Sequence, residues 1–184
     1  MRIIAGKYKG RRLKTPRGSA IRPTADRIRE AIFNILGGGC RDRQVFDIFA
    51  GTGALGLEAL SRGADRAAFV DNRRTAVDAI RRNIAVCGCE ENSAVFLADV
   101  RRQLNCLNQV KRTAELVFLD PPYRLDLIRP ALQHLVRRSL VAPEARLVIE
   151  HSVHEALPEL EGHFRLDDRR RYGKTLVSFL TYMV

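Results

Sequence analysis

The chain has 184 residues, enough for one domain with a short extension. Hydrophobic residues make up 46% and charged residues 29%, a balance that is typical of a globular protein and excludes a disordered chain. No apolar run approaches the roughly 18–20 residues that span a bilayer, and the N-terminus lacks a signal-peptide core. The four cysteines are not needed as disulfides in a chain of this size. We therefore expect a cytoplasmic protein that does not bind a membrane.

Positive charge is concentrated at the N-terminus. The formal net charge is +11, and residues 1–30 supply +8 of it, from ten basic and two acidic side chains. Such a cluster indicates a polyanionic partner, because Lys and Arg bind phosphates, although a solvated surface is the alternative interpretation. The residues expected to contact RNA are Arg2, Lys7, Lys9, Arg11, Arg12, Arg22 and Arg27.

The first 39 residues form a unit of their own in the sequence pattern. Short apolar stretches and Gly steps in residues 2–14 predict an extended strand or hairpin, and residues 15–23 predict a loop. Ile28, Ile32 and Leu36 then fall on one helical face, and three glycines at 37–39 end that helix. We interpret residues 1–39 as a basic extension.

Residues 40–184 predict a second, larger domain. Apolar strands at 44–49, 66–70, 94–97, 115–119 and 146–149 alternate with helices at 54–62, 75–87, 100–109 and 126–138. This alternation predicts a doubly wound, mostly parallel α/β sheet with helices on both faces. Two further strands, 163–171 and 175–183, are joined too closely for a helical crossover and predict a C-terminal antiparallel hairpin.

The first strand leads into a glycine-rich turn. Gly51, Gly53 and Gly56 satisfy G-x-G-x-x-G between that strand and the following helix. The pattern lets a phosphate- or adenosine-bearing ligand approach the backbone at a helix N-terminus. The purely structural interpretation is a helix start whose small residues serve only for packing. Two cofactor classes compete for this loop: nicotinamide or flavin dinucleotides, and S-adenosylmethionine.

Three aspartates favour S-adenosylmethionine. Asp71 ends the second strand, where its carboxylate can accept the ribose hydroxyls of either cofactor. Asp47 lies inside the first strand, and a buried carboxylate there calls for a cationic partner such as the ammonium of a methionine moiety. Asp99 follows the third strand and could accept from an adenine amino group or serve as a helix N-cap. The expected cofactor contacts are Asp47, Ala50, Gly51, Thr52, Gly53, Asp71 and Asp99.

The fourth strand ends in the most specific motif, Asp120-Pro121-Pro122-Tyr123. Two consecutive prolines remove two backbone donors and leave mainly acceptors, namely the Asp120 carboxylate and the nearby carbonyls. Acceptors suit an exocyclic NH2 group, and the ring of Tyr123 can stack on the base that bears it. A rigid turn with a surface tyrosine is the structural alternative. We expect these four residues to form the catalytic site.

These motifs resemble a known group. The glycine-rich loop with Asp120–Tyr123 is similar to class I S-adenosylmethionine-dependent methyltransferases that modify exocyclic amino groups of nucleobases. Further motifs resemble the bacterial small-subunit ribosomal RNA guanine-N2 methyltransferases, the RsmD family. They are Arg2-Ile3-Ile4-Ala5-Gly6, Lys9-Gly10-Arg11, Arg22-Pro23-Thr24, Asp26-Arg27, Arg29-Glu30-Ala31 and the run from Phe49 to Ala64.

The resemblance implies a seven-stranded methyltransferase sheet, S-adenosylmethionine as cofactor and a guanine N2 in 16S rRNA as target. The substrate would be the small ribosomal subunit or a late assembly intermediate. We expect a monomer without a metal, since the cysteines lack zinc-binding spacing. Three alternatives stay open: an adenine-N6 methyltransferase acting on DNA or RNA, a non-catalytic RNA-binding assembly factor, and a nicotinamide oxidoreductase.

Overall fold

The structure, a computed structural model, describes residues 1–15, 23–102, 104–158 and 162–184. Its α-helices are α1 (Pro23–Leu36), α2 (Ala54–Ser61), α3 (Arg74–Cys87) and α4 (Ile128–Arg137), and its 3₁₀ helices are η1 (Glu90–Asn92) and η2 (Asn105–Val110). Its strands are β1 (Gln44–Ile48), β2 (Arg66–Asp71), β3 (Ser93–Leu97), β4 (Ala114–Leu119), β5 (Val141–Ser152), β6 (Phe164–Tyr172) and β7 (Thr175–Tyr182). Within these ranges no helix is both long and apolar enough to cross a membrane.

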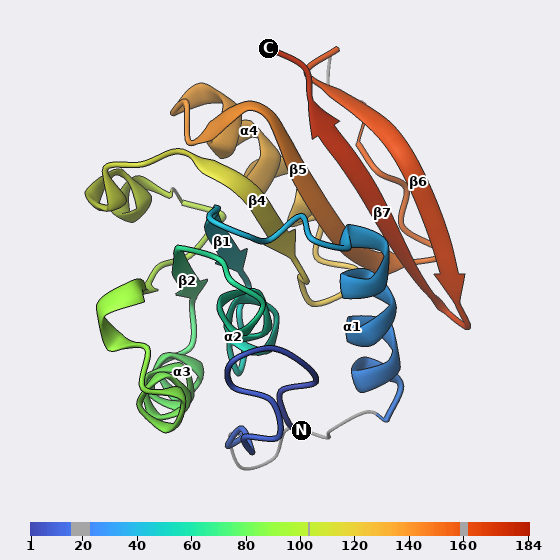
Figure 1. The fold of residues 1–184 in the computed structure, drawn as a ribbon. Helices are drawn as coiled ribbons and strands as arrows, with labels where there is room; N and C mark the ends of the chain where they lie inside the picture. The colour runs from blue at the N-terminus through green and yellow to red at the C-terminus, as the bar shows by residue number, and fades with distance from the viewer. Residues whose placement is uncertain (16–22, 103, 159–161) are drawn as a thin grey trace.

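The seven strands form one sheet in the order β3-β2-β1-β4-β5-β7-β6 (Figure 1). The first five run parallel, and β7 lies antiparallel between β5 and β6. The predicted doubly wound sheet with a C-terminal antiparallel hairpin is therefore confirmed. Chain order reverses between β1 and β4, and ligands of such sheets bind outside the carboxyl ends of the strands at this switch point.

Two hydrophobic clusters sandwich the sheet. One cluster joins Phe69 and Phe118 of the sheet to α1, α2 and α3 through residues such as Phe33, Leu57 and Ile80. The other joins the opposite face of the sheet to η2 and α4. Because both faces of the sheet are covered, the central strands are buried on both sides, and all five residues of β1 are buried, including the polar Gln44 and Asp47.

The N-terminal segment, residues 1–15, lies against α2 beside the carboxyl edge of the sheet (Figure 1). The Ser61 carbonyl accepts a hydrogen bond from the backbone N–H of Lys7 at 2.7 Å, and the Ser61 hydroxyl accepts one from the backbone N–H of Tyr8 at 2.9 Å. A Cβ at Gly6 would lie 1.8 Å from the Ser61 carbonyl oxygen, and Gly6 has φ +82°, so only glycine fits this contact.

Three predicted elements differ in the structure. The strand or hairpin expected in residues 2–14 is an irregular hairpin with one antiparallel bridge, between Arg2 and Arg12. Backbone hydrogen bonds still cross it, such as the one from the Ile3 N–H to the Arg11 carbonyl at 3.0 Å, but the N–H groups of Ile4 and Ala5 turn to Glu58 of α2 and interrupt the regular pairing. The helix expected at 100–109 is instead the 3₁₀ helix η2 at Asn105–Val110. The strand expected at 146–149 extends from Val141 to Ser152, with a register irregularity opposite Ala114 and Leu116.

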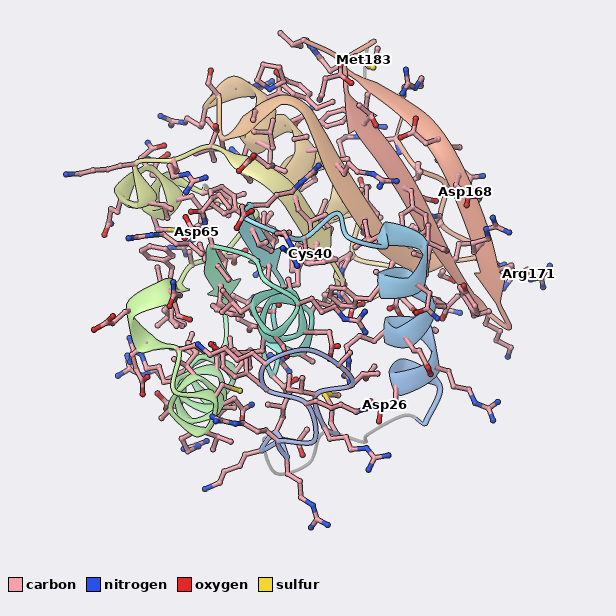
Figure 2. The ribbon with its side chains drawn as sticks, in the orientation of Figure 1. Asp26, Cys40, Asp65, Asp168, Arg171 and Met183 are labelled. Carbon is pink, nitrogen blue, oxygen red and sulfur yellow. The ribbon has the colours of Figure 1, made fainter. Side chains whose placement is uncertain are left out.

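Strand β6 is the outer edge of the sheet and is strongly charged. Figure 2 shows Asp168 and Arg171 on this strand, away from the core. Asp168 pairs with Arg170 at 2.9 Å, and Arg165 pairs with Asp167 at 2.8 Å. Charged side chains on an edge strand oppose pairing with another chain, so this strand is protected against aggregation.

Glu58 fastens the N-terminal segment to α2. Its side chain is fully buried and accepts the backbone N–H groups of Ile4 at 2.7 Å and Ala5 at 3.0 Å. Arg62 donates to it at 2.8 Å, and the buried Arg29 guanidinium lies 3.9 Å away. We expect Glu58→Ala to lower the free energy of unfolding by roughly 3–5 kcal/mol. The substitution leaves two backbone N–H groups and the Arg62 guanidinium without this acceptor, and it removes one of the two counter-charges of the buried Arg29, whose other counter-charge is Asp26.

Urea titration measures this loss. Arg112→Ala is the matched control, because Arg112 forms exposed ion pairs with Asp65 and Glu115 and its removal should cost less than about 1 kcal/mol. Equal losses for the two variants would contradict the role assigned to Glu58.

Candidate active site at the carboxyl edge of the sheet

The glycine-rich loop and the Asp120–Tyr123 turn begin side by side. Ile48 and Leu119, the last residues of β1 and β4, are paired in register. The N–H of Asp120 points to the Ile48 carbonyl at 3.5 Å. Both predicted motifs therefore start at the switch point of the sheet, although they are separated by about seventy residues of sequence.

Asp71 secures the glycine-rich loop to β2. Its Oδ2 accepts the N–H of Gly51 at 2.9 Å, and its Oδ1 accepts the N–H of Arg73 at 2.9 Å. Gly51 has φ +58° and Gly53 has φ +76°, conformations that let the loop turn sharply into α2. A Cβ added at Gly51 would meet no atom closer than 4.0 Å, so the loop presents open backbone on that side.

Asp47 is a buried carboxyl group with one hydrogen-bond donor. Its side chain is 1% exposed, and its Oδ2 accepts the N–H of Gly56 at 2.8 Å. The pKa of Asp47 is raised to about 7, mainly by burial and also by the negative charge of Asp71, while the hydrogen bond from the Gly56 N–H opposes the shift. A carboxyl group held in this way gains most from a cationic ligand, which would restore its charged form.

Asn83 ties the loop to the N-terminal segment, and sequence patterns did not point to it. Its Nδ2 donates to the carbonyls of Thr52 and Lys14, both at 2.9 Å, and its Oδ1 accepts the N–H of Lys14 at 2.7 Å. Thr52 also donates its hydroxyl to the sulfur of Met1 at 3.5 Å. The expected cofactor loop and the basic segment are thus in direct contact. An asparagine on the buried face of a predicted helix was the only signal in the sequence.

Asp99 is bound locally by Arg101. The Arg101 guanidinium forms a bidentate pair with the carboxylate at 2.7–3.1 Å, and the Arg101 N–H donates to it at 3.0 Å. These bonds lower the pKa of Asp99. A carboxylate that accepts the N–H two residues later is close to the helix N-cap that was the alternative interpretation of Asp99. The contact of Asp99 with an adenine amino group stays a prediction.

The Asp120–Tyr123 turn is fixed at its far end. Pro121 is buried, whereas Asp120 and Pro122 are exposed. The Tyr123 hydroxyl lies 2.9 Å from the hydroxyl of Thr175 on β7 and 3.1 Å from Glu150 on β5. Burial, with the neighbouring carboxylates, raises the pKa of Tyr123 to about 12, so the phenol keeps its proton. Thr175 and Glu150 were not singled out from the sequence, because only the β5–β7 pairing brings them to this turn.

The basic residues expected to contact RNA lie mostly on the surface. Arg2, Lys7, Lys9, Arg11, Arg12 and Arg27 are exposed, and Arg22 lies outside the described residues. Arg11 also packs on the Tyr8 ring at 5.3 Å and donates to the carbonyl of Val86 at the end of α3. In the described ranges no group of three or more His, Cys, Asp or Glu side chains is arranged to hold a metal ion.

The sequence of this chain is similar to those of several bacterial methyltransferases. Ribosomal RNA small subunit methyltransferase D of Escherichia coli (strain K12) is 34% identical over 174 residues, which cover 95% of this chain and 86% of that protein. YlbH of Bacillus subtilis (strain 168) is 33% identical over 178 residues, 97% of each chain.

Solved structures give the same result. The structure of yhhF from Escherichia coli has a TM-score of 0.85 at 32% identity, and covers 100% of this chain and 98% of that one. The more distant SMU.776, solved in complex with SAH, has a TM-score of 0.68 at 14% identity over 88% of this chain and 50% of that one, and it shows the fold alone. A family model described as "Conserved hypothetical protein 95" matches residues 1–181. The chain therefore belongs to this family, the RsmD family of methyltransferases.

Proposed function

We propose that this protein transfers a methyl group from S-adenosylmethionine to the exocyclic N2 of a guanine in 16S rRNA, within the small ribosomal subunit or a late assembly intermediate. The observation that carries the proposal is the adjacency of two turns. The glycine-rich loop after β1 and the acceptor-rich Asp120–Tyr123 turn after β4 start from paired strand ends. A methyl donor and an amino acceptor held by these turns would meet at one edge of the sheet. The family relatives named above support the assignment to rRNA.

The residues of the loop fit S-adenosylmethionine. Asp47 is a buried carboxyl group whose raised pKa marks it as poorly compensated, which matches the positive charge of the methionine ammonium. Ala50, Gly51, Thr52 and Gly53 offer backbone that a ligand can approach, and Asp71 would receive the ribose hydroxyls beside the Gly51 N–H. Asp99 would take the adenine end. When bound, the cofactor supplies an electrophilic methyl group on a positively charged sulfur that leaves as a neutral thioether.

Asp120 would prepare the amino group for attack. An exocyclic amine is a poor nucleophile, because its lone pair is delocalised into the ring. Hydrogen bonds from its two N–H groups to the Asp120 carboxylate and a carbonyl of the diproline turn favour the pyramidal nitrogen. The lone pair would then form the new N–C bond as the bond between sulfur and the methyl carbon breaks, and the methylated nitrogen would pass one proton to the Asp120 carboxylate or to water. The hydrogen bonds from the amino group to Asp120 and the carbonyl strengthen as positive charge develops on the nitrogen, so they stabilise the transition state. Tyr123 would stack on the base, with its hydroxyl held by Thr175.

The basic extension, residues 1–39, would hold the RNA. Its exposed Lys and Arg side chains lie on a segment that Asn83 joins to the cofactor loop. Phosphate contacts made there would position the RNA relative to the loop without reading its sequence.

Asp120→Asn tests the role of the turn. We expect this substitution to lower kcat roughly 10²–10⁴-fold, because the amide is a weaker acceptor for a nitrogen that becomes positive. S-adenosylmethionine affinity, measured by calorimetry, should stay within about threefold of the wild type. Labelled methyl transfer to small subunits from cells lacking the protein gives the rate, and mass spectrometry of nucleosides identifies the product. N6-methyladenine as the product, or cofactor binding without transfer, would contradict the proposed function.

Asp47→Asn should produce opposite effects on stability and on cofactor binding. The carboxyl of Asp47 titrates near pH 7 in the folded protein, well above its ordinary value, so ionisation of this group lowers stability as the pH rises from about 4 to 7. The variant should therefore gain on the order of 2–4 kcal/mol in free energy of unfolding at pH 8 and almost nothing below about pH 4.

The same variant should bind S-adenosylmethionine at least about tenfold more weakly at pH 8, because a neutral amide replaces the counter-charge of the ammonium. Wild-type affinity should rise between pH 6 and pH 8, and that rise should disappear in the variant. Urea titration and calorimetry at the two pH values measure both effects. A pH-independent wild-type affinity would contradict the pairing.

Lys9→Ala combined with Arg12→Ala tests the basic extension. Both side chains are exposed, and their loss should reduce the salt dependence of small-subunit binding, measured as log Kd against log[salt], by about 1.5–2. Arg138→Ala is the matched control, since Arg138 is exposed near the opposite edge, where the Leu140 carbonyl accepts the Ala114 N–H. An unchanged slope in the double variant would show that the extension makes no phosphate contacts.

A further inference from the structure

Two carboxylates occupy corresponding positions on neighbouring parallel strands at the proposed active site. The register of β4 and β5 pairs Phe118 with Val148 and Leu119 with Ile149, and Asp120 and Glu150 are the next residue along each chain. Burial raises the pKa of the Tyr123 hydroxyl, and both carboxylates lie close enough to this group to add to the shift. Like charges at opposed positions of a sheet are destabilising. Such a pair at the carboxyl edge indicates a functional role, because stability alone would not select it.

Glu150 is directed toward the side of the sheet on which the cofactor loop lies. Side chains alternate along a strand, so Glu150 shares a face with Val148, which packs in the cluster of α1, α2 and α3. Asp47, in register with Phe118, points to the same face, where its Cβ approaches Gly56 of α2. Glu150 itself is half-buried. Its Oε1 accepts the Tyr123 hydroxyl at 3.1 Å, so the carboxylate stands directly beside the ring proposed to stack on the target base.

The edges of the purine bases differ in what they offer to a carboxylate. Guanine presents three N–H donors along adjacent atoms, one on N1 and two on the N2 amino group. Adenine presents an N6 amino group next to N1, which is an acceptor. The Asp120 turn has acceptors for an amino group and treats both bases alike. A second carboxylate beside it would accept from N1–H of guanine and would repel the lone pair on N1 of adenine.

We propose that Glu150 is the residue that selects guanine, by accepting the N1–H of the base whose amino group lies at Asp120. The inference rests on the proposed function and deepens it, because it assigns the choice between guanine and adenine to one side chain. A carboxylate can accept several hydrogen bonds at once, so binding to guanine is compatible with the contact to Tyr123.

The test uses a base that keeps the amino group but lacks the N1 proton. Small subunits are reconstituted on 16S rRNA in which the methylated guanosine, first located by mass spectrometry, is replaced by 2,6-diaminopurine riboside. Wild-type kcat/KM should be roughly 100-fold lower on this substrate, because a site built to accept a hydrogen bond discriminates strongly against a base without the donor. Glu150→Gln should lose roughly 10–100-fold on guanine. Its amide can donate to N1 of diaminopurine, so its preference for guanine should fall below about tenfold.

Thr175→Val is the matched control for a merely structural role. It removes the other hydrogen bond of the Tyr123 hydroxyl and leaves both carboxylates in place. This variant should lower kcat/KM on the two substrates by the same factor and keep the wild-type preference.

The rates on the two substrates distinguish failure of this inference from failure of the proposed function. Equal wild-type rates on guanine and diaminopurine would overturn the inference without any variant, and so would an equal loss on both substrates in Glu150→Gln. In either case methylation of guanine by the wild type would leave the proposed function intact. Absence of methylation by the wild type would overturn the proposed function and this inference with it.

Discussion

The candidate site depends on carboxylates that hold backbone N–H groups at the ends of parallel strands. Asp71 accepts the N–H of Gly51, and Asp47 accepts that of Gly56, so the loop between β1 and α2 is fixed at both ends. The bond from Asp47 forms in a fully buried place, where a charged carboxylate is costly. One of the two groups that fix the loop, Asp47, therefore pays an electrostatic cost for its place in the fold. A cationic ligand would relieve that cost and contribute the same energy to its own binding.

The N-terminal segment takes part in this arrangement and is not a detached arm. Glu58 and Ser61 of α2 bind its backbone, and Asn83 of α3 joins it to Thr52. Its basic side chains remain exposed, while Ile3, Tyr8 and Leu13 are buried in the core. One segment thus presents charge to solvent and packs against the loop that would bind the cofactor. Asn83 joins the two directly, because it binds both Lys14 of the segment and Thr52 of the loop.

Local patterns predicted the sheet and its central motifs well, since each strand, glycine turn and strand-end aspartate is determined by residues that are neighbours in the sequence. Asp47, Asp71 and the Asp120–Tyr123 turn lie at the expected edge for this reason. Glu58, Asn83, Glu150 and Thr175 could not be predicted, because their partners are 27–69 residues away in the chain. The same limit explains the irregular N-terminal hairpin: its pattern indicated strand pairing, which is present, but the contacts of Ile4 and Ala5 with Glu58 of α2, which interrupt that pairing, are long-range.

The distribution of charge suits the two proposed ligands, which have opposite signs. Asp47, Asp71, Asp120 and Glu150 gather at the carboxyl ends of β1, β2, β4 and β5, inside a chain whose net charge is +11. A cationic methyl donor would favour the acidic interior of the edge, and RNA phosphates would favour the basic residues around it. Salt weakens the interaction between charges of the two groups that lie farther apart than a Debye length, about 8 Å in physiological buffer. An acidic centre can therefore operate on a polyanion, provided that only the neutral base, and not its phosphate, enters it.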